Sequence, residues 1–132
     1  MNTIKKYILV DDDPINNIIS GIELKRTLAE MDIRINTFEV PEDGLAFLQN
    51  DFSKNPEPTI LLLDINMPSI SGWQFMEEYE KFSKEIRDQI TIYILSSSVD
   101  PRDIDRAEAN KYIKGFILKP LDNEKILSLT GV

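Results

Sequence analysis

The sequence predicts an α/β fold in which a doubly wound, five-stranded parallel sheet carries helices on both faces. Five short apolar runs alternate with stretches of helical periodicity along the 132 residues, and successive β-α-β units favour parallel strands joined by right-handed crossovers. The third run, residues 60–63, is apolar throughout, which is typical of a central strand covered on both sides. The length suits one domain over residues 1–132, and we expect no output domain within it.

The first strand is predicted at residues 7–10, an apolar run that stops at three consecutive aspartates. Asp13 and Pro14 are typical of a helix N-cap and of the first helical residue. Apolar residues at helical spacing then predict the helix itself. They are Ile15, Ile18, Ile19, Ile22, Leu24, Leu28 and Met31.

The middle of the chain predicts an edge strand, a short helix and the central strand. Residues 33–38 alternate between apolar and polar, which favours a half-exposed edge strand. Residues 41–50 predict a helix with Leu45 and Leu48 turned inward, and residues 59–63 form the most apolar strand.

Three further helices are predicted from their N-cap signals, which are a capping box, an Asp-Pro pair and a single aspartate. The caps are Ser71 with Gln74, Asp100 with Pro101, and Asp122. The first of these helices would bury one face, formed by Phe75, Met76, Tyr79 and Phe82. Residues 90–95 and 115–118 predict the fourth and fifth strands.

Composition excludes several classes of function. The net charge of −8 disfavours binding to nucleic acid or to anionic membranes. With no cysteine and no histidine, thiolate nucleophiles, disulfides, Ser-His-Asp catalysis and zinc sites of the usual kind are excluded. No apolar run is long enough to cross a membrane, and the N-terminus lacks the apolar region of a signal peptide, so we expect a cytoplasmic protein.

Polar residues end four of the five predicted strands, and they are Asp11 and Asp12, Asp64, Ser96 and Lys119. In an open parallel sheet the functional site lies at these carboxyl ends. Three carboxylates placed together must hold a proton or bind a cation, and oxygen ligands suit Mg²⁺. A lysine and a hydroxyl can bind phosphoryl oxygens, and a carboxylate in line with a phosphoryl group can become an aspartyl phosphate.

Each of these residues also has an ordinary structural explanation. The acidic run could serve only to favour a helix dipole, and we accept a capping role for Asp13. Asp64 could be a turn residue, Ser96 part of a loop, and Lys119 a solvated lysine. Their joint placement at successive strand ends is what favours a site.

With these motifs, the chain resembles the receiver (response regulator) domain of two-component phosphorelays, in its single-domain type. The resemblance runs from Ile8 to about Leu129. It rests on four segments in order, which are residues 8–14, residues 61–68 with Gly72, residues 93–97 and residues 115–120. It implies a flavodoxin-like sheet with strand order 2-1-3-4-5.

The resemblance implies a role for each polar residue. Asp64 would be the phosphoacceptor, with Mg²⁺ as cofactor. The implied metal ligands are Asp11, acting partly through water, Asp12, Asp64 and the backbone carbonyl of Asn66. The residues implied to bind the phosphoryl group or to switch with it are Ser96, in place of the commoner Thr, Lys119, and Phe116, in place of a frequent Tyr. The Lys119–Pro120 bond is expected to be cis.

Partners also follow from the resemblance. The donor would be a sensor histidine kinase or a phosphotransfer protein, since this chain has no histidine of its own. A downstream protein target would bind the face of the fourth helix, fifth strand and fifth helix, roughly residues 102–129. The chain would not be a classical enzyme, because it would catalyse only transfer to its own aspartate and autodephosphorylation.

Three alternatives stand beside this interpretation. An aspartyl phosphatase of the haloacid-dehalogenase type would use Asp11 as nucleophile and Asp13 as general acid, but it leaves Asp64 unexplained. A non-phosphorylated, receiver-like scaffold would keep the fold without the chemistry. A flavodoxin-like cofactor binder is disfavoured, because three aspartates after the first strand would repel a cofactor phosphate.

Overall fold

Five parallel strands form one sheet in the order β2-β1-β3-β4-β5, which is the order that the resemblance implies. The structure is a computed structural model that describes residues 4–130. Residues 1–3, which belong to the N-terminal segment considered above as a signal peptide, lie outside the described residues. The strands are β1 (Lys6–Val10), β2 (Arg34–Phe38), β3 (Thr59–Leu63), β4 (Ile90–Ser96) and β5 (Ile113–Leu118).

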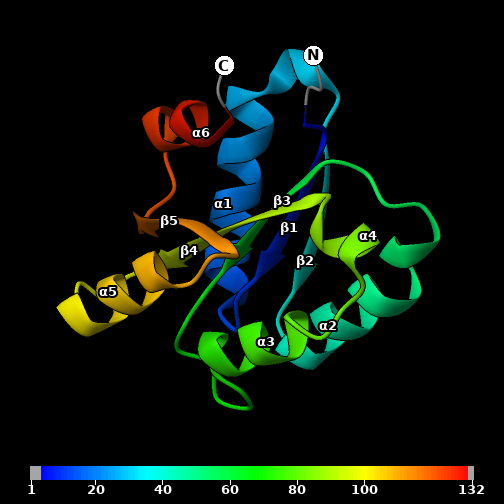
Figure 1. Cartoon of the computed structure of the whole chain (residues 1–132). Coiled ribbons are helices and arrows are strands. Elements are labelled where there is room, and N and C mark those ends of the chain that lie inside the picture. The colour runs from blue at the N-terminus through cyan, green and yellow to red at the C-terminus, as the bar shows by residue number, and fades with distance from the viewer. Residues whose placement is uncertain (1–3, 131–132) are drawn as a thin grey trace.

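Helices cover both faces of the sheet (Figure 1). One face carries α1 (Pro14–Thr27) and α6 (Asn123–Thr130), and the other carries α2 (Pro41–Asn50), α3 (Gly72–Tyr79), α4 (Lys84–Arg87) and α5 (Pro101–Ala109). Short 3-10 turns follow α1 at Ala29–Met31 and α2 at Phe52–Lys54. The sequence patterns did not predict α4, so the fourth and fifth helices expected above are α5 and α6.

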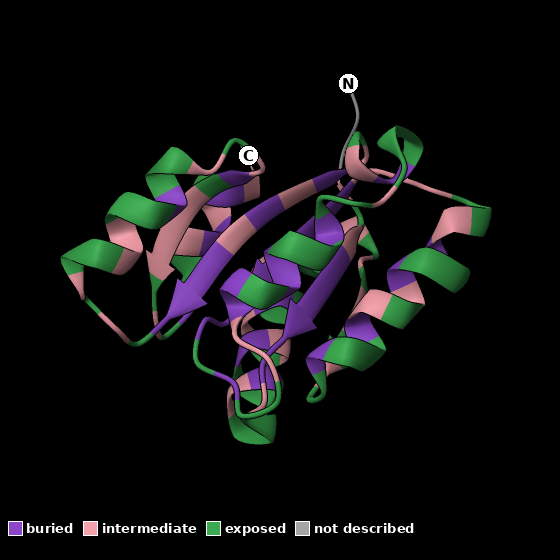
Figure 2. Ribbon diagram, turned by 60° about the horizontal axis from the view of Figure 1, so that its bottom comes forward, coloured by how far each residue is buried: buried purple, intermediate pink, exposed green. Residues whose placement is uncertain are grey.

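The core consists of two apolar clusters, one on each face of the sheet. Every residue of β3 is buried, as expected for the central strand, and Figure 2 shows this burial continuing into β1 and much of β4. Of the two inward residues expected in α2, Leu48 is fully buried, and Leu45 is partly buried against the same cluster. The apolar runs therefore fix the layers that position the strand ends.

The predicted caps are present. The side chain of Asp13 accepts a hydrogen bond from the Ile15 amide, and Asp100 accepts one from the Arg102 amide. Ser71 and Gln74 form both hydrogen bonds of the capping box. Asp122 accepts a hydrogen bond from the Lys125 amide at 2.9 Å.

One expectation about α3 is wrong. Phe82 lies beyond the helix, which ends at Tyr79, because the chain turns there with the Phe82 amide bonded to the Tyr79 carbonyl at 3.0 Å. Phe82 still packs against the core, with its ring centroid 6.0 Å from that of Tyr79. The apolar spacing thus identified a packed residue but extended the helix too far.

The isoleucine stripe that predicts α1 lies on the solvent side of the helix. Ile15 is 65% exposed and Ile18 61%, and Ile19 and Ile22 are also exposed. The helix buries Asn17, Ser20 and Leu24 instead. Helical spacing indicates that a stripe exists, but it does not say which side of the helix meets the sheet. None of the helices in residues 4–130 is both long and apolar enough to span a bilayer.

Candidate functional site

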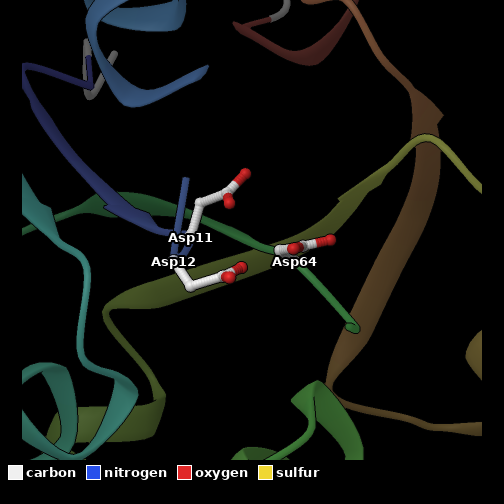
Figure 3. Close-up of side chains that lie close together, drawn as sticks. All are labelled: Asp11, Asp12 and Asp64. Atoms are coloured by element: carbon white, nitrogen blue, oxygen red, sulfur yellow. The ribbon is translucent and has the colours of Figure 1, made fainter. Parts of the chain in front are cut away.

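Three carboxylates meet where β1 and β3 end. Asp11 and Asp12 follow β1, and Asp64 follows β3 directly. The two strands are neighbours in register, and the Asp64 amide donates to the Val10 carbonyl at 2.9 Å. One oxygen from each carboxylate lies within 4.8 Å of the others. Figure 3 shows the three side chains near one another, Asp11 and Asp12 from one segment and Asp64 from another. The sheet therefore brings together aspartates that lie far apart in the sequence.

Lys119, at the end of β5, supplies the positive charge of the cluster. Its Nζ is 2.7 Å from Oδ2 of Asp11 and 3.7 Å from Oδ1 of Asp64. Its backbone amide donates to the Ser96 carbonyl at 2.9 Å, which places it beside the end of β4. The Lys119–Pro120 bond is cis, as expected. One ammonium faces three carboxylates, so negative charge remains uncompensated.

Asp11 is the most fully engaged of the three carboxylates. Its Oδ1 accepts from the Asp13 amide at 2.9 Å, and its Oδ2 accepts from Nδ2 of Asn16 at 2.7 Å. Asn17 Nδ2 donates to the Asp11 carbonyl at 2.9 Å. We did not predict these two asparagines from the sequence. The available signal was a pair of amide side chains in the first turn of a helix that directly follows an acidic run.

Asp64 lies in a setting that disfavours its charge. The carboxyl is buried, with Oδ1 accepting from the Ile65 amide at 2.9 Å. Burial raises the pKa of Asp64 to about 6, and the neighbouring Asp11 charge acts in the same direction, while Lys119 opposes them. A carboxylate destabilised in this way gains from a nearby cation.

Ser96 lies beside Lys119 of the acidic cluster, whereas Phe116 makes its contacts with the apolar core. Ser96 ends β4 with its side chain fully buried, and its Oγ accepts from the Ser98 amide at 3.1 Å. Phe116 lies in β5 and is half-buried against the apolar core cluster on the face of the sheet that carries α2 to α5. Asn66 is exposed just beyond Asp64. The short contacts in the structure thus join Asp11, Asp64 and Lys119.

The donor set fits Mg²⁺. All three side chains offer carboxylate oxygen, the ligand that this ion prefers, and they lie close enough to share one ion. Asp12 is half-buried, which leaves access from solvent for the water ligands that Mg²⁺ retains. Asp13 is exposed and engaged as a helix cap, so it does not join the cluster.

Comparisons with known proteins agree with this geometry. A family model described as the response regulator receiver domain matches residues 7–130. A two component response regulator from Cytophaga hutchinsonii is 27% identical, with a TM-score of 0.87 and coverage of 98% of this chain and 96% of that one. A response regulator receiver protein from Dyadobacter fermentans DSM 18053 is 29% identical, with a TM-score of 0.79 and coverage of 94% and 93%.

A more distant structure, the Vibrio cholerae chemotaxis protein CheY4, shares the fold at 20% identity, with a TM-score of 0.69 and coverage of 96% of this chain and 95% of that one. A comparison with curated protein sequences gives no match.

Proposed function

Since the chain belongs to the response regulator receiver domain family, we propose that Asp64 accepts a phosphoryl group from a phosphohistidine of a sensor kinase or phosphotransfer protein. The observation that carries this proposal is the buried Asp64 carboxylate beside two further aspartates and one lysine. Such a cluster suits a residue that must react with an anionic group while a cation offsets the charge.

In the proposed transfer, a carboxylate oxygen of Asp64 forms the new O–P bond. The bond between phosphorus and the donor imidazole breaks, and its electron pair stays on the imidazole nitrogen, which takes up a proton. Asp64 must be deprotonated to react, and Lys119 Nζ is placed to offset charge on the phosphoryl oxygens. Mg²⁺ held by Asp11, Asp12, Asp64 and the Asn66 carbonyl would supply further charge neutralisation and orientation.

Phosphorylation would then bias an existing equilibrium between two conformations. The hydroxyl of Ser96 would donate to a phosphoryl oxygen and draw the loop between β4 and α5 inward. Phe116 would repack into the space that this movement leaves. A downstream protein would detect the change on the face formed by α5, β5 and α6, roughly residues 102–129.

The exposed side of α1 is the surface we assign to the phosphodonor protein. Four large apolar side chains lie there at helical spacing, namely Ile15, Ile18, Ile19 and Ile22. The helix starts just after the acidic run, and Asn16 in its first turn donates to Asp11, so the stripe begins beside the site. An exposed apolar stripe of this kind is typical of a protein contact.

Labelling with a phosphodonor tests the function. Wild-type protein should acquire an acid-stable, alkali-labile phosphoryl group in the presence of Mg²⁺, and the label should be lost in EDTA, in Asp64→Asn and in Asp12→Asn. Asp13→Asn is the matched control, because that residue caps α1, and asparagine caps equally well. Undiminished labelling of Asp64→Asn would overturn the assignment. Turnover of a small phosphomonoester would instead favour the phosphatase alternative.

A further inference from the structure

α5 is attached to the rest of the domain by little apolar contact. Ala107 is its one buried residue, and Ile104 is half-buried, while most of the remaining side chains are exposed. Burial of so small a surface contributes little free energy. The polar contacts of α5 with its neighbours therefore weigh heavily in holding the helix where it is.

The main polar attachment is made by Trp73 of α3. The indole is 8% exposed, and its Nε1 donates to Oδ1 of Asp103 at 3.4 Å. The guanidinium carbon of Arg106 lies 4.7 Å from the centroid of the indole ring, a cation–π arrangement. Asp103 and Arg106 are three residues apart on α5, so they hold the indole from the same side of that helix.

Trp73 is also tied closely to the proposed phosphoacceptor. It follows Gly72, whose amide donates to the Ile65 carbonyl at 2.8 Å. A Cβ atom at Gly72 would lie 2.6 Å from the Asp64 carbonyl oxygen and 2.9 Å from the Cα of Ile65. The first turn of α3 therefore packs directly on the backbone of Asp64, and Trp73 extends from that turn to α5.

A second connection runs from the site to the start of α5. The Oγ of Ser96 accepts from the Ser98 amide, and the Oγ of Ser98 accepts from the Asp100 amide at 3.3 Å. Asp100 then caps α5. A movement of Ser96 toward Asp64 would be passed through this loop to the N-terminus of α5, while Trp73 holds the middle of the same helix.

We propose that Trp73, Asp103 and Arg106 form a latch that holds α5 in its unphosphorylated position and opens when Asp64 is phosphorylated. This inference rests on the proposed function, because it assigns the latch to the same switch. Since the latch stabilises one of two states, weakening it must favour the other state and tighten binding of any ligand that prefers that state.

The chain contains a single tryptophan, so its fluorescence reports the latch directly. The probe is beryllofluoride with Mg²⁺, which mimics a phosphoryl group on an aspartate, and the measurement is quenching of the indole emission by acrylamide. We expect quenching of the wild-type protein to increase at saturating beryllofluoride. Unchanged quenching at saturation would overturn the latch.

Two variants of the latch provide the second measurement. Arg106→Gln and Asp103→Asn should increase quenching before beryllofluoride is added, and should lower the half-saturating beryllofluoride concentration by about fivefold. Arg102→Gln is the matched control. It removes the same charge one turn earlier on α5, where the side chain is 90% exposed and pairs with Asp100 rather than with Trp73.

The outcomes separate the two proposals. If Asp64 is not labelled by any phosphodonor, the proposed function fails. If Asp64 is labelled but Arg106→Gln and Arg102→Gln reach half-saturation at the same beryllofluoride concentration, the proposed function stands and the latch is refuted.

Discussion

Lys119 lies closer to Asp11 than to Asp64. Its Nζ is 2.7 Å from the Asp11 carboxylate and 3.7 Å from that of Asp64. The lysine charge is thus shared unequally, and it lies closer to the Asp11 carboxylate than to that of Asp64. This is consistent with the raised pKa of Asp64, for which burial and Asp11 outweigh Lys119. An added cation beside Asp64 would therefore favour the charged form of this carboxyl group.

Replacing Lys119 with Met should destabilise the metal-free protein. The change leaves the buried carboxylates of Asp11 and Asp64 without their counter-charge, which costs about 3 kcal/mol of unfolding free energy. Mg²⁺ should restore much of this loss, because the ion supplies the missing positive charge. Urea unfolding in EDTA and in Mg²⁺ measures both effects. Lys114→Met, on the exposed side of β5, is the control and should change neither value.

Asp64→Asn should stabilise the metal-free protein at neutral pH. The pKa of Asp64 is about 6 in the folded protein, against 3.8 ordinarily. Between these values the folded state binds more protons than the unfolded state, so stability falls as pH rises through this window. The asparagine variant avoids that loss.

We therefore expect Asp64→Asn to exceed the wild type by on the order of 2 kcal/mol at pH 7.5, with the difference shrinking toward zero near pH 4. Urea unfolding in EDTA at several pH values checks this. If the stability advantage of Asp64→Asn over the wild type instead grew as the pH was lowered, the pKa of Asp64 would be lowered rather than raised.

Two glycine substitutions should have opposite effects on stability. At Gly72 a Cβ would contact the backbone of Asp64 and Ile65, so Gly72→Ala should cost about 2 kcal/mol or more. At Gly21, inside α1, a Cβ would meet nothing within 4 Å, so Gly21→Ala should gain about 0.5–1 kcal/mol from helix propensity. Thermal or urea unfolding of the pair decides the matter. If Gly72→Ala and Gly21→Ala changed the unfolding free energy equally, the close packing of α3 on the Asp64 backbone would be contradicted.

Ile18→Asp should impair phosphorylation by a protein donor but not by a small molecule. The side chain is 61% exposed, so unfolding free energy should change by no more than about 0.5 kcal/mol. A charge within an apolar contact should slow transfer from a phosphohistidine protein by about tenfold or more. Acetyl phosphate should label the variant at the wild-type rate. Val40→Asp, at an exposed valine before α2, is the matched control.

The sheet and the placement of the carboxylates were predictable because they depend on local signals. Each strand is a short apolar run with a polar residue at its end, and parallel β-α-β connections bring such ends to one edge. The predicted strand at residues 59–63 coincides with β3, and Asp13, Ser71 and Asp100 cap helices as expected. Sequence was sufficient wherever a residue acts through its immediate neighbours.

Other features depend on tertiary contacts that no local pattern encodes. The isoleucines of α1 face solvent because packing on the sheet selects the side that carries Asn17, Ser20 and Leu24. Asn16 reaches Asp11 across the first helical turn, and Trp73 meets α5 from a distant segment of the chain. These relationships emerge only when the helices are placed against the sheet and against one another.

The in-register pairing of β1 with β3 places Val10 opposite Leu63, and the acidic residues follow at the same level. Side chains alternate between the two faces of a strand, so inserting or deleting one residue in β3 would turn the Asp64 carboxylate to the opposite side. The acidic cluster therefore depends on the length of this strand as well as on the identity of its residues. Natural length variation is accordingly expected in the connections at the far edge of the sheet, such as the segment between α2 and β3.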